Sequence, residues 1–434
     1  MSHAPIDQCT AEERAAEECT ASLPTSKPPS SPPDTSLHPE TARYHYLDNL
    51  RAMAMTLGIL FHASIAYLPI GYETWTVANT TNSLGLEAVA YFTHLFRMPL
   101  FMFVAGFFGH YLLMKRGTKG FIKNRSVRVL APFVVFLPLL LAAIVGVVVY
   151  AAYTAQNRPP ALMFIVNNYQ NPDVMNARFS TMHLWFLFNL MVFYVSALLL
   201  IRLIPFSLNK WLSGWSPVAL KVALLFVVPL MLVPALYVQI APPALAPDRI
   251  YPQLWSFGYY GIYFALGWLF FSNRRLLDGL DRYWALLFAL SVVIFAVVFS
   301  LYPRTLSFEQ MLHPEDIQVE PVRHGILAVL QGFVSVYMVI VCLILGKKYL
   351  NLHNRFFRYV ADSSYWIYLI HPPIVMYVQV ILLDKEWNLW LEFLLTSVIT
   401  FAVGLLTYQL LVRYTPIGWM LNGRKHKSKP AASV

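Results

Sequence analysis

Long apolar runs, separated by short polar segments, fill the chain from about residue 44 to residue 421. A transmembrane helix needs about 20 mostly apolar residues to cross a hydrocarbon core about 30 Å thick. The pattern predicts an all-α, polytopic membrane protein with about ten transmembrane helices. The predicted spans are 49–69, 86–114, 128–153, 183–204, 218–240, 255–272, 283–302, 324–345, 363–383 and 389–412.

Composition indicates that lipid, rather than water, surrounds most of this chain. Hydrophobic residues make up 58% of it and charged residues 12%, whereas soluble domains carry about 25% charged residues. The net charge of +10 does not predict a nucleic-acid partner, because Lys and Arg accumulate in the cytoplasmic loops of membrane proteins. Cys9, Cys19 and Cys342 form no disulfide or metal-binding pattern, so we expect no metal and no permanently bound cofactor.

The basic residues are concentrated in alternate loops. The densely basic segments are 115–128, 273–282, 346–358 and the C-terminal tail, whereas "GYETWTVANTTNS" has no Lys or Arg. The positive-inside rule therefore predicts that both termini are cytoplasmic. The expected location is the cell inner membrane, which the chain crosses several times. We then expect three long loops to be extracytoplasmic, namely 154–182, 241–254 and 303–323. The chain has no convincing internal repeat, so the inverted halves of many transporters are unsupported.

The two ends of the chain differ from the apolar domain, which we place at residues 43–422. Residues 1–42 include "ASLPTSKPPSSPPDTSLHPE" and have too little apolar surface to offset chain entropy. They are predicted to form a disordered cytoplasmic tail without the apolar core of a signal peptide. Residues 423–434 are predicted to form a short basic cytoplasmic tail.

Ionisable side chains inside membrane spans are candidates for function. Arg51 and His62 are eleven residues apart, which is close to three turns at about 3.6 residues per turn, so both lie on one helix face. Their axial separation of ~16 Å predicts Arg51 near the cytoplasmic side and His62 near the midplane. Asp48 is placed to pair with Arg51. The structural alternative is an arginine extended to the headgroups and a histidine bonded to a neighbouring helix.

Arginines in two further segments are also candidates. Arg97 lies well inside the second span, with His94 one turn earlier, and a guanidinium group there must face protein, water or an anion. Arg97 could equally hold carbonyl groups at a helix interface. Arg125 and Arg128 form R-x-x-R, whose spacing places both groups on one face, suited to phosphates. Most such pairs, however, only set the orientation of the chain in the membrane.

Histidines and aromatic residues mark two other spans. His183 and Trp185 open the fourth span, where tryptophan is also typical of an interfacial aromatic belt. His371 precedes a proline in the ninth span and could simply support a kink. Acidic residues are scarce at membrane depth, since Glu87 and Glu392 lie near the outer ends of spans. This scarcity disfavours a proton-coupled pump with a carboxylate relay, while a relay made of histidines stays open.

Several quoted segments together resemble the acyltransferase-3 family of integral membrane acyltransferases. They are "YLDNLRAMAMTLGILFH", with an arginine, ten residues and a histidine, then "RSVR", "HLWFL" and "SSYWIYLIHPP". The resemblance covers Tyr44 to about Leu421. The segment "HLFRMPLFMFVAGFF" is similar to a subgroup taken to succinylate osmoregulated periplasmic glucans. The chain departs from longer members by lacking an appended hydrolase-like domain, which suggests direct transfer to the acceptor.

This resemblance implies an O-acyltransferase that moves an acyl group from cytoplasmic acyl-CoA to a hydroxyl of an extracytoplasmic glycan. His62 is the expected general base, with a covalent acyl-histidine as a variant. Arg51, oriented by Asp48, is expected to hold the pyrophosphate or the thioester. Arg97 is expected to bind a succinyl carboxylate or stabilise the oxyanion.

The remaining candidates are expected to bind the two substrates. Arg125, Arg128 and Lys123 would bind or attract the phosphates of coenzyme A. The expected contacts to the acyl group and the glycan come from His94, His183, Trp185 and His371. Besides lipid, acyl-CoA and a glycan, the sequence predicts no partner, and it leaves open the oligomeric state, the hydroxyl and the choice between acetyl and succinyl donors.

Two other functions are compatible with the residues alone. A transporter or flippase for a glycan or lipid-linked sugar would also need a polar midplane and a basic cytoplasmic face, but would consume no acyl-CoA. A structural membrane scaffold would tolerate conservative polar replacements of His62 and Arg97.

Overall fold

The computed structural model describes residues 45–171, 180–203, 208–239, 246–302, 307, 310, 319–351 and 355–423. All of these residues belong to a single unit, Tyr44–Val434. Their regular structure is helical, and the strand-like pairing in this part of the chain is an isolated bridge between Ser180 and Arg249. The predicted all-α fold is therefore confirmed. The tail predicted at 1–42 and residues 424–434 lie outside the described residues.

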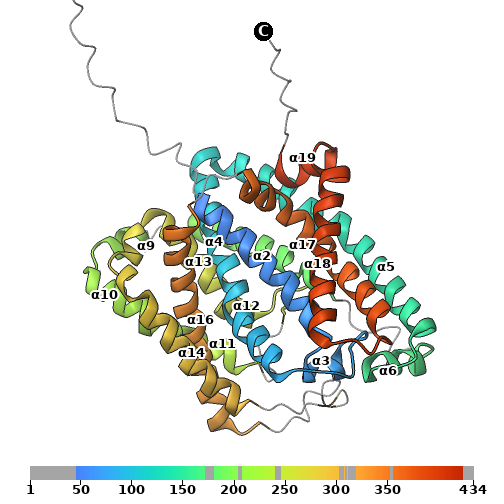
Figure 1. Ribbon diagram of the computed structural model, residues 1–434. Helices are drawn as coiled ribbons and strands as arrows, with labels where there is room; N and C mark the ends of the chain where they lie inside the picture. Colours follow the sequence, from blue (N-terminus) through green and yellow to red (C-terminus); the bar gives the residue numbers. More distant parts are fainter. Residues whose placement is uncertain are drawn as a thin grey trace, which may run out of the picture. The chain divides into compact units, whose positions relative to one another are not determined.

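The helices follow one another along the chain as the colours of Figure 1 indicate. Short 3₁₀ and π segments, which the figure does not label, are named η. Their bounds are α2 His45–Ile65, α3 Pro69–Thr74, α4 Leu84–Arg125, η2 Ser126–Leu130, α5 Ala131–Thr154, α6 Pro160–Asn168, η3 Met182–Leu184, α8 Trp185–Leu203, α9 Leu208–Ser213, α10 Pro217–Val222, η4 Ala223–Val227, α11 Val228–Tyr237, α12 Leu254–Ser256, η5 Phe257–Gly261, α13 Ile262–Ser272, η6 Arg274–Leu277, η7 Asp281–Tyr283, α14 Trp284–Leu301, α16 Pro321–Tyr349, α17 Arg355–Leu382, α18 Leu389–Thr407, η9 Tyr408–Val412 and α19 Pro416–Asn422.

Seven helical stretches in the described part of the chain are long and apolar enough to cross a membrane. The longest, Leu84–Thr154, contains two of the predicted spans. The predicted spans 49–69 and 255–272 are helical but do not belong to these seven stretches. The first carries polar side chains and the second is rich in aromatic residues and glycine, which lowers the hydropathy of both. A multi-span membrane protein is confirmed, whereas the number ten and the cytoplasmic termini stay predictions.

Two predicted spans, whose bounds carry an uncertainty of a few residues, differ at one end from the observed helices. The first was expected to reach residue 69, but α2 ends at Ile65, and a turn leads into α3, which Pro69 begins. Proline is favoured in a first helical turn because its missing N–H would have no partner there. The second was expected to end at residue 114, but α4 continues to Arg125 across a break at Gly117. The φ of 63° at Gly117 is readily available only to glycine.

Helix α2 lies at the centre of the helices that form the candidate site. It packs against α4, α16, α17 and α18, as can be followed in Figure 1. On its other side, α4 packs closely on α13, where Gly106 faces the carbonyl of Phe264 and Gly267 faces that of Phe103. A Cβ atom at either glycine would collide with that carbonyl. Small residues of this kind allow membrane helices to approach backbone to backbone.

Hydroxyl groups from α16, η5 and α13 replace the backbone hydrogen bond that Pro99 removes from α4. Pro99 has no N–H, so the carbonyl of Leu95, four residues earlier, loses its helical donor. The hydroxyl of Ser335 donates to this carbonyl at 2.7 Å and that of Tyr259 at 3.0 Å. Tyr263 in turn donates to Ser335 at 2.7 Å. Buried hydroxyl groups thus replace the missing backbone bond, as membrane proteins require.

The segment between α2 and α4 is bonded to α17 and α18. The indole N–H of Trp75 donates to Gln379 Oε1 at 2.8 Å, and the amide of Gln379 donates to the carbonyl of Ala63 at 3.0 Å. Asn79 donates to the buried carboxylate of Glu392 at 2.8 Å. These bonds fix the end of α2 that carries His62.

Candidate active site

One cavity of about 290 Å³ brings together six of the residues predicted from the sequence. Its walls come from α2, α4, the start of α8, the middle of α17 and the segment that includes Ala246 and Asp248. The predicted residues in the wall are His62, His94, Arg97, His183, Trp185 and His371. Segments more than 300 positions apart in the sequence thus meet here, because α2 and α17 pack side by side (Figure 1).

Three imidazole rings form a row along this cavity. The ring centroids of His62 and His371 are 5.0 Å apart, and those of His371 and His183 are 5.5 Å apart. His371 Nδ1 is bonded to the carbonyl of Tyr368 at 2.8 Å, and His183 Nε2 to the carbonyl of Leu369 at 3.0 Å. His371 thus bonds a carbonyl of its own helix beside the prolines, and the same side chain also lines the cavity.

Arg97 is buried, with 4% of its surface exposed, and its guanidinium group is held in three ways. It donates to the carbonyl of Leu57 at 3.2 Å, contacts His94 Nδ1 at 3.3 Å and lies 4.5 Å from the ring centre of Phe61. The rings of Phe61 and His94 are stacked at 4.6 Å. The alternative in which Arg97 holds a carbonyl group at a helix interface therefore agrees with the bond from its Nη1 to Leu57. Its Nε has no hydrogen-bonding partner among the described residues.

Trp185 does not lie in a lipid-facing aromatic belt. It is buried against Tyr260, with ring centroids 5.0 Å apart, and it lines the cavity. The backbone beside it is also fixed, since the hydroxyl of Tyr368 donates to the carbonyl of His183 at 2.7 Å. The side chains of Trp185 and His183 are thus held in fixed positions at the α8 side of the cavity.

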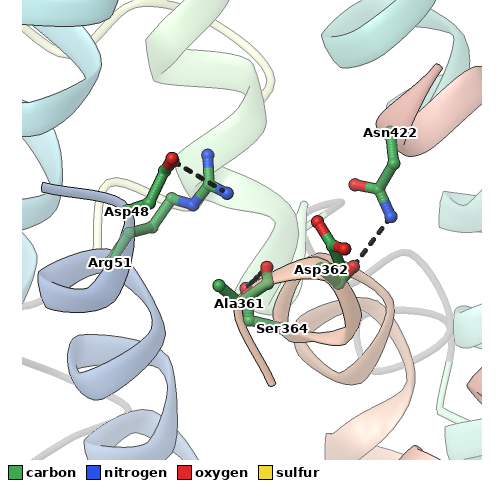
Figure 2. Close-up of polar contacts among 6 residues, drawn as sticks. All are labelled: Asp48, Arg51, Ala361, Asp362, Ser364 and Asn422. Carbon is green, nitrogen blue, oxygen red and sulfur yellow. Dashed lines mark hydrogen bonds and ion pairs between the residues drawn. The ribbon is translucent and has the colours of Figure 1, made fainter. Parts of the chain in front are cut away.

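Arg51 lies beyond the cavity on the same helix face as its lining residues. Ala54 and Met55, one turn later, belong to the wall. Arg51 Nη2 is 3.6 Å from Asp48 Oδ1, which is the predicted pairing. Figure 2 shows this pair together with Asp362 at the start of α17, whose carbonyl accepts from Asn422 at 2.7 Å. With 40% of its side chain exposed, Arg51 is accessible to a ligand.

The R-x-x-R arginines belong to the same end of α2. The hydroxyl of Tyr365 interacts electrostatically with Arg51, Arg125 and Arg128, and it donates to the carbonyl of Arg128 at 2.7 Å. Arg125 donates to the carbonyl of Phe108 at 3.2 Å, and Arg128 to that of Asn422 at 3.2 Å. Each guanidinium group keeps further N–H donors. Lys123 is exposed and stands apart from these contacts.

Four of the wall residues that the prediction missed bear on the chemistry of the cavity. Gly58 and Phe61 lie on α2, Tyr368 lies one turn before His371, and Asp248 accepts a hydrogen bond from Ser180 in the segment before α12. Helical spacing from Arg51 and His62 points to Gly58, and the same argument from His371 points to Tyr368. No pattern in the sequence indicates Asp248, because it lies outside any helix.

The site combines imidazole bases and guanidinium groups in a largely apolar enclosure. In the described part of the chain, no group of His, Cys, Asp and Glu side chains is arranged to hold a metal ion. An imidazole can accept a proton from a hydroxyl, and a guanidinium group can stabilise a developing oxyanion. The arrangement therefore suits transfer of an acyl group to an alcohol.

Comparisons with known proteins agree with this chemistry. A family model described as "Acyltransferase domain" (Acyl_transf_3) matches residues 44–409. The protein named Glucans biosynthesis protein C from Escherichia coli strain K12 is 24% identical over 389 residues, which cover 88% of this chain and 95% of that protein. The protein of the same name from strain E24377A matches with the same identity and coverage. No solved structure matches the chain. The chain belongs to the acyltransferase-3 family, and it is a membrane acyltransferase, as its sequence motifs predict.

Proposed function

We propose that this acyltransferase moves a succinyl or acetyl group from cytoplasmic acyl-CoA to a hydroxyl of a periplasmic or cell-surface glycan, such as an osmoregulated glucan. One observation carries the proposal: the His62 cavity reaches Ala54 and Met55 on α2, one turn from Arg51. On α17, Tyr365, which bonds the carbonyl of Arg128, lies one turn from the cavity residue Tyr368. A thioester with a phosphate-rich carrier fits this combination of an arginine cluster and a histidine cavity. The names of the E. coli relatives support a glucan as the acceptor.

The reaction begins with the acceptor hydroxyl and the His62 ring. His62 takes the hydroxyl proton while the oxygen attacks the thioester carbonyl, and a tetrahedral intermediate forms. The C–S bond then breaks, the acyl ester remains on the sugar, and the proton on His62 passes to the departing thiolate. Arg97 is the charged group that can stabilise the oxyanion or pair with the free carboxylate of a succinyl group.

The arginines near the start of α2 bind the acyl-CoA donor. Arg51, Arg125 and Arg128 offer guanidinium donors to the phosphates of coenzyme A, and Lys123 adds positive charge at the surface. Asp48 limits the orientations of Arg51 through their ion pair. His183, His371 and Trp185 are left to contact the acceptor on the far side of the cavity.

The test uses purified protein in proteoliposomes, succinyl-CoA or acetyl-CoA, and an isolated glucan. We expect His62→Ala to lower the rate of acyl transfer by about 10²–10⁴-fold, the usual contribution of a general base. Arg51→Ala should raise the KM for acyl-CoA. His324→Ala is the matched control, because His324 bonds the carbonyl of Tyr237 and does not line the cavity. Normal glucan acylation by His62→Ala, measured by mass spectrometry, contradicts the proposal, as does glucan transport without release of free CoA.

A further inference from the structure

Two consecutive prolines in α17 create two carbonyl groups that lack helical donors. Pro372 and Pro373 have no N–H, so the carbonyls of Tyr368 and Leu369, each four residues earlier, lose their backbone bonds. His371 Nδ1 bonds the first carbonyl at 2.8 Å, and His183 Nε2 bonds the second at 3.0 Å. Two imidazoles of the cavity thus replace two missing backbone N–H groups.

These bonds determine which nitrogen of each ring carries hydrogen. A carbonyl oxygen only accepts, so His371 Nδ1 and His183 Nε2 must both be donors. A neutral imidazole has a single N–H, which leaves a lone pair on its other nitrogen. Those other atoms, His371 Nε2 and His183 Nδ1, are buried and have no hydrogen-bonding partner among the described residues. Both rings line the same cavity, with centroids 5.5 Å apart.

A ligand that brings hydrogen-bond donors satisfies both nitrogens, because a buried acceptor without a partner is costly. We propose that His183 and His371 form a pair of hydrogen-bond acceptors that binds hydroxyl groups of the acyl acceptor, and that Pro372 and Pro373 are positioning residues that fix the acceptor nitrogens. This inference rests on the proposed function and specifies its acceptor subsite. The pair takes neutral polyhydroxylated molecules, since two lone pairs repel an anion.

The location of the pair fits this assignment. The centroid of the His371 ring is 5.0 Å from that of His62, so a hydroxyl bound at His371 lies beside the proposed base. Arg97, the group suited to an anionic acyl chain, lies on α4 in the same wall. The cavity therefore separates an acceptor side, on α8 and α17, from a donor side, on α2 and α4.

Amide replacements distinguish ligand binding from a structural role. The side-chain amide of asparagine takes the place of histidine Nδ1, and that of glutamine takes the place of Nε2. His183→Gln and His371→Asn keep the bond to the carbonyl and lose the acceptor that faces the cavity. His183→Asn and His371→Gln are the matched controls, which keep the acceptor and lose the carbonyl bond. We expect the first two variants to raise the KM for the glucan about tenfold, with an unchanged KM for acyl-CoA. The two controls should raise the KM for the glucan less than the first two variants do, because the acceptor atom remains and only the bond that positions it is lost.

A purely structural role predicts the opposite order, and that order overturns the proposal. Pro372→Ala gives a second test that leaves every histidine in place, because it restores an N–H that competes with His371 for the carbonyl of Tyr368. We expect ¹⁵N spectra of labelled protein to show His371 changing from one tautomer to a mixture, together with a raised KM for the glucan. An unchanged tautomer in Pro372→Ala also overturns the proposal. Wild-type protein that acylates no glucan refutes the proposed function itself, whereas wild-type acylation with the reversed order of variants refutes only the acceptor pair.

Discussion

Gly58 offers a direct test of whether the cavity is the path of the acyl donor. It lies on α2 between Arg51 and His62, and a Cβ atom built on it meets no heavy atom within 4 Å. A leucine there adds four carbon atoms of about 30 Å³ each, comparable to a water molecule in the liquid, and so fills ~120 Å³. That is roughly two-fifths of a cavity of about 290 Å³. Gly58→Leu should therefore obstruct the donor without disturbing the packing of helices.

The expected effects on activity and stability have opposite signs. Glycine in a helix interior costs about 0.5–1 kcal/mol relative to alanine, so both Gly58→Ala and Gly58→Leu should unfold at the same or a higher temperature than the wild type. Displacement of a substrate by about 1 Å can cost ~10²-fold in rate, and we expect at least this loss in kcat/KM for Gly58→Leu. Gly58→Ala fills only about 30 Å³ and should keep most of the activity.

The assay measures release of free CoA in proteoliposomes with acetyl-CoA and succinyl-CoA, alongside thermal unfolding in detergent. A loss of activity in a protein as stable as the wild type places the donor path beside Gly58. Wild-type kcat/KM in a folded Gly58→Leu variant refutes the reasoning, because the added side chain then occupies space that no substrate uses.

Three further predictions address the donor and the packing of the helices. Arg97→Gln should lower the ratio of kcat/KM for succinyl-CoA to kcat/KM for acetyl-CoA by about 10–100-fold, because a charged hydrogen bond to the carboxylate is lost. An unchanged ratio contradicts a carboxylate role for Arg97. Arg128→Ala should raise the KM for acyl-CoA and weaken the dependence of this KM on salt. The control Lys123→Ala alters an exposed residue and should change the KM less than about twofold. Equal effects in the two variants argue against phosphate binding at Arg128. Gly106→Ala should destabilise the protein by about 1–3 kcal/mol, because its Cβ collides with the carbonyl of Phe264, and an unchanged unfolding temperature contradicts the close packing of α4 on α13.

Hydropathy and helical spacing predicted the helices and part of the site, because both depend on local chain geometry. Helices account for most of the described residues in each of the ten segments expected to span the membrane, and Arg51 and His62 both lie on α2. The predicted spans differ from α2 and α4 at one end for opposite reasons: apolar residues continue past Ile65, whereas α4 continues through the basic residues that follow Met114. In α4 the break depends on a single positive φ at Gly117, which the sequence marks only as a glycine.

The assembly of the cavity could not be predicted from local patterns. His62 and His371 are neighbours because α2 packs on α17, and no periodicity within either segment specifies that pairing. Trp185 illustrates the same limit: a tryptophan at the start of a span is compatible with lipid and with the protein interior, and only the contact with Tyr260 decides between them. The sequence motifs indicated the type of reaction, while the tertiary packing determined which side chains line one cavity.

The prolines connect the fold to the chemistry. A break in a membrane helix exposes a carbonyl that lipid cannot satisfy, so a polar side chain must be buried beside it. At Pro99 the replacements are hydroxyl groups that bond the carbonyl of Leu95, and this fixes the segment of α4 that carries Arg97. At Pro372 and Pro373 the replacements are imidazoles, whose second nitrogen remains for a ligand. A hydroxyl that donates to a carbonyl accepts only through the same oxygen, as Ser335 does from Tyr263, whereas an imidazole accepts through a second nitrogen on the far side of its ring. The histidines beside Pro372 and Pro373 therefore do more than stabilise the helix, since the second nitrogen of each ring can accept a hydrogen bond from the substrate.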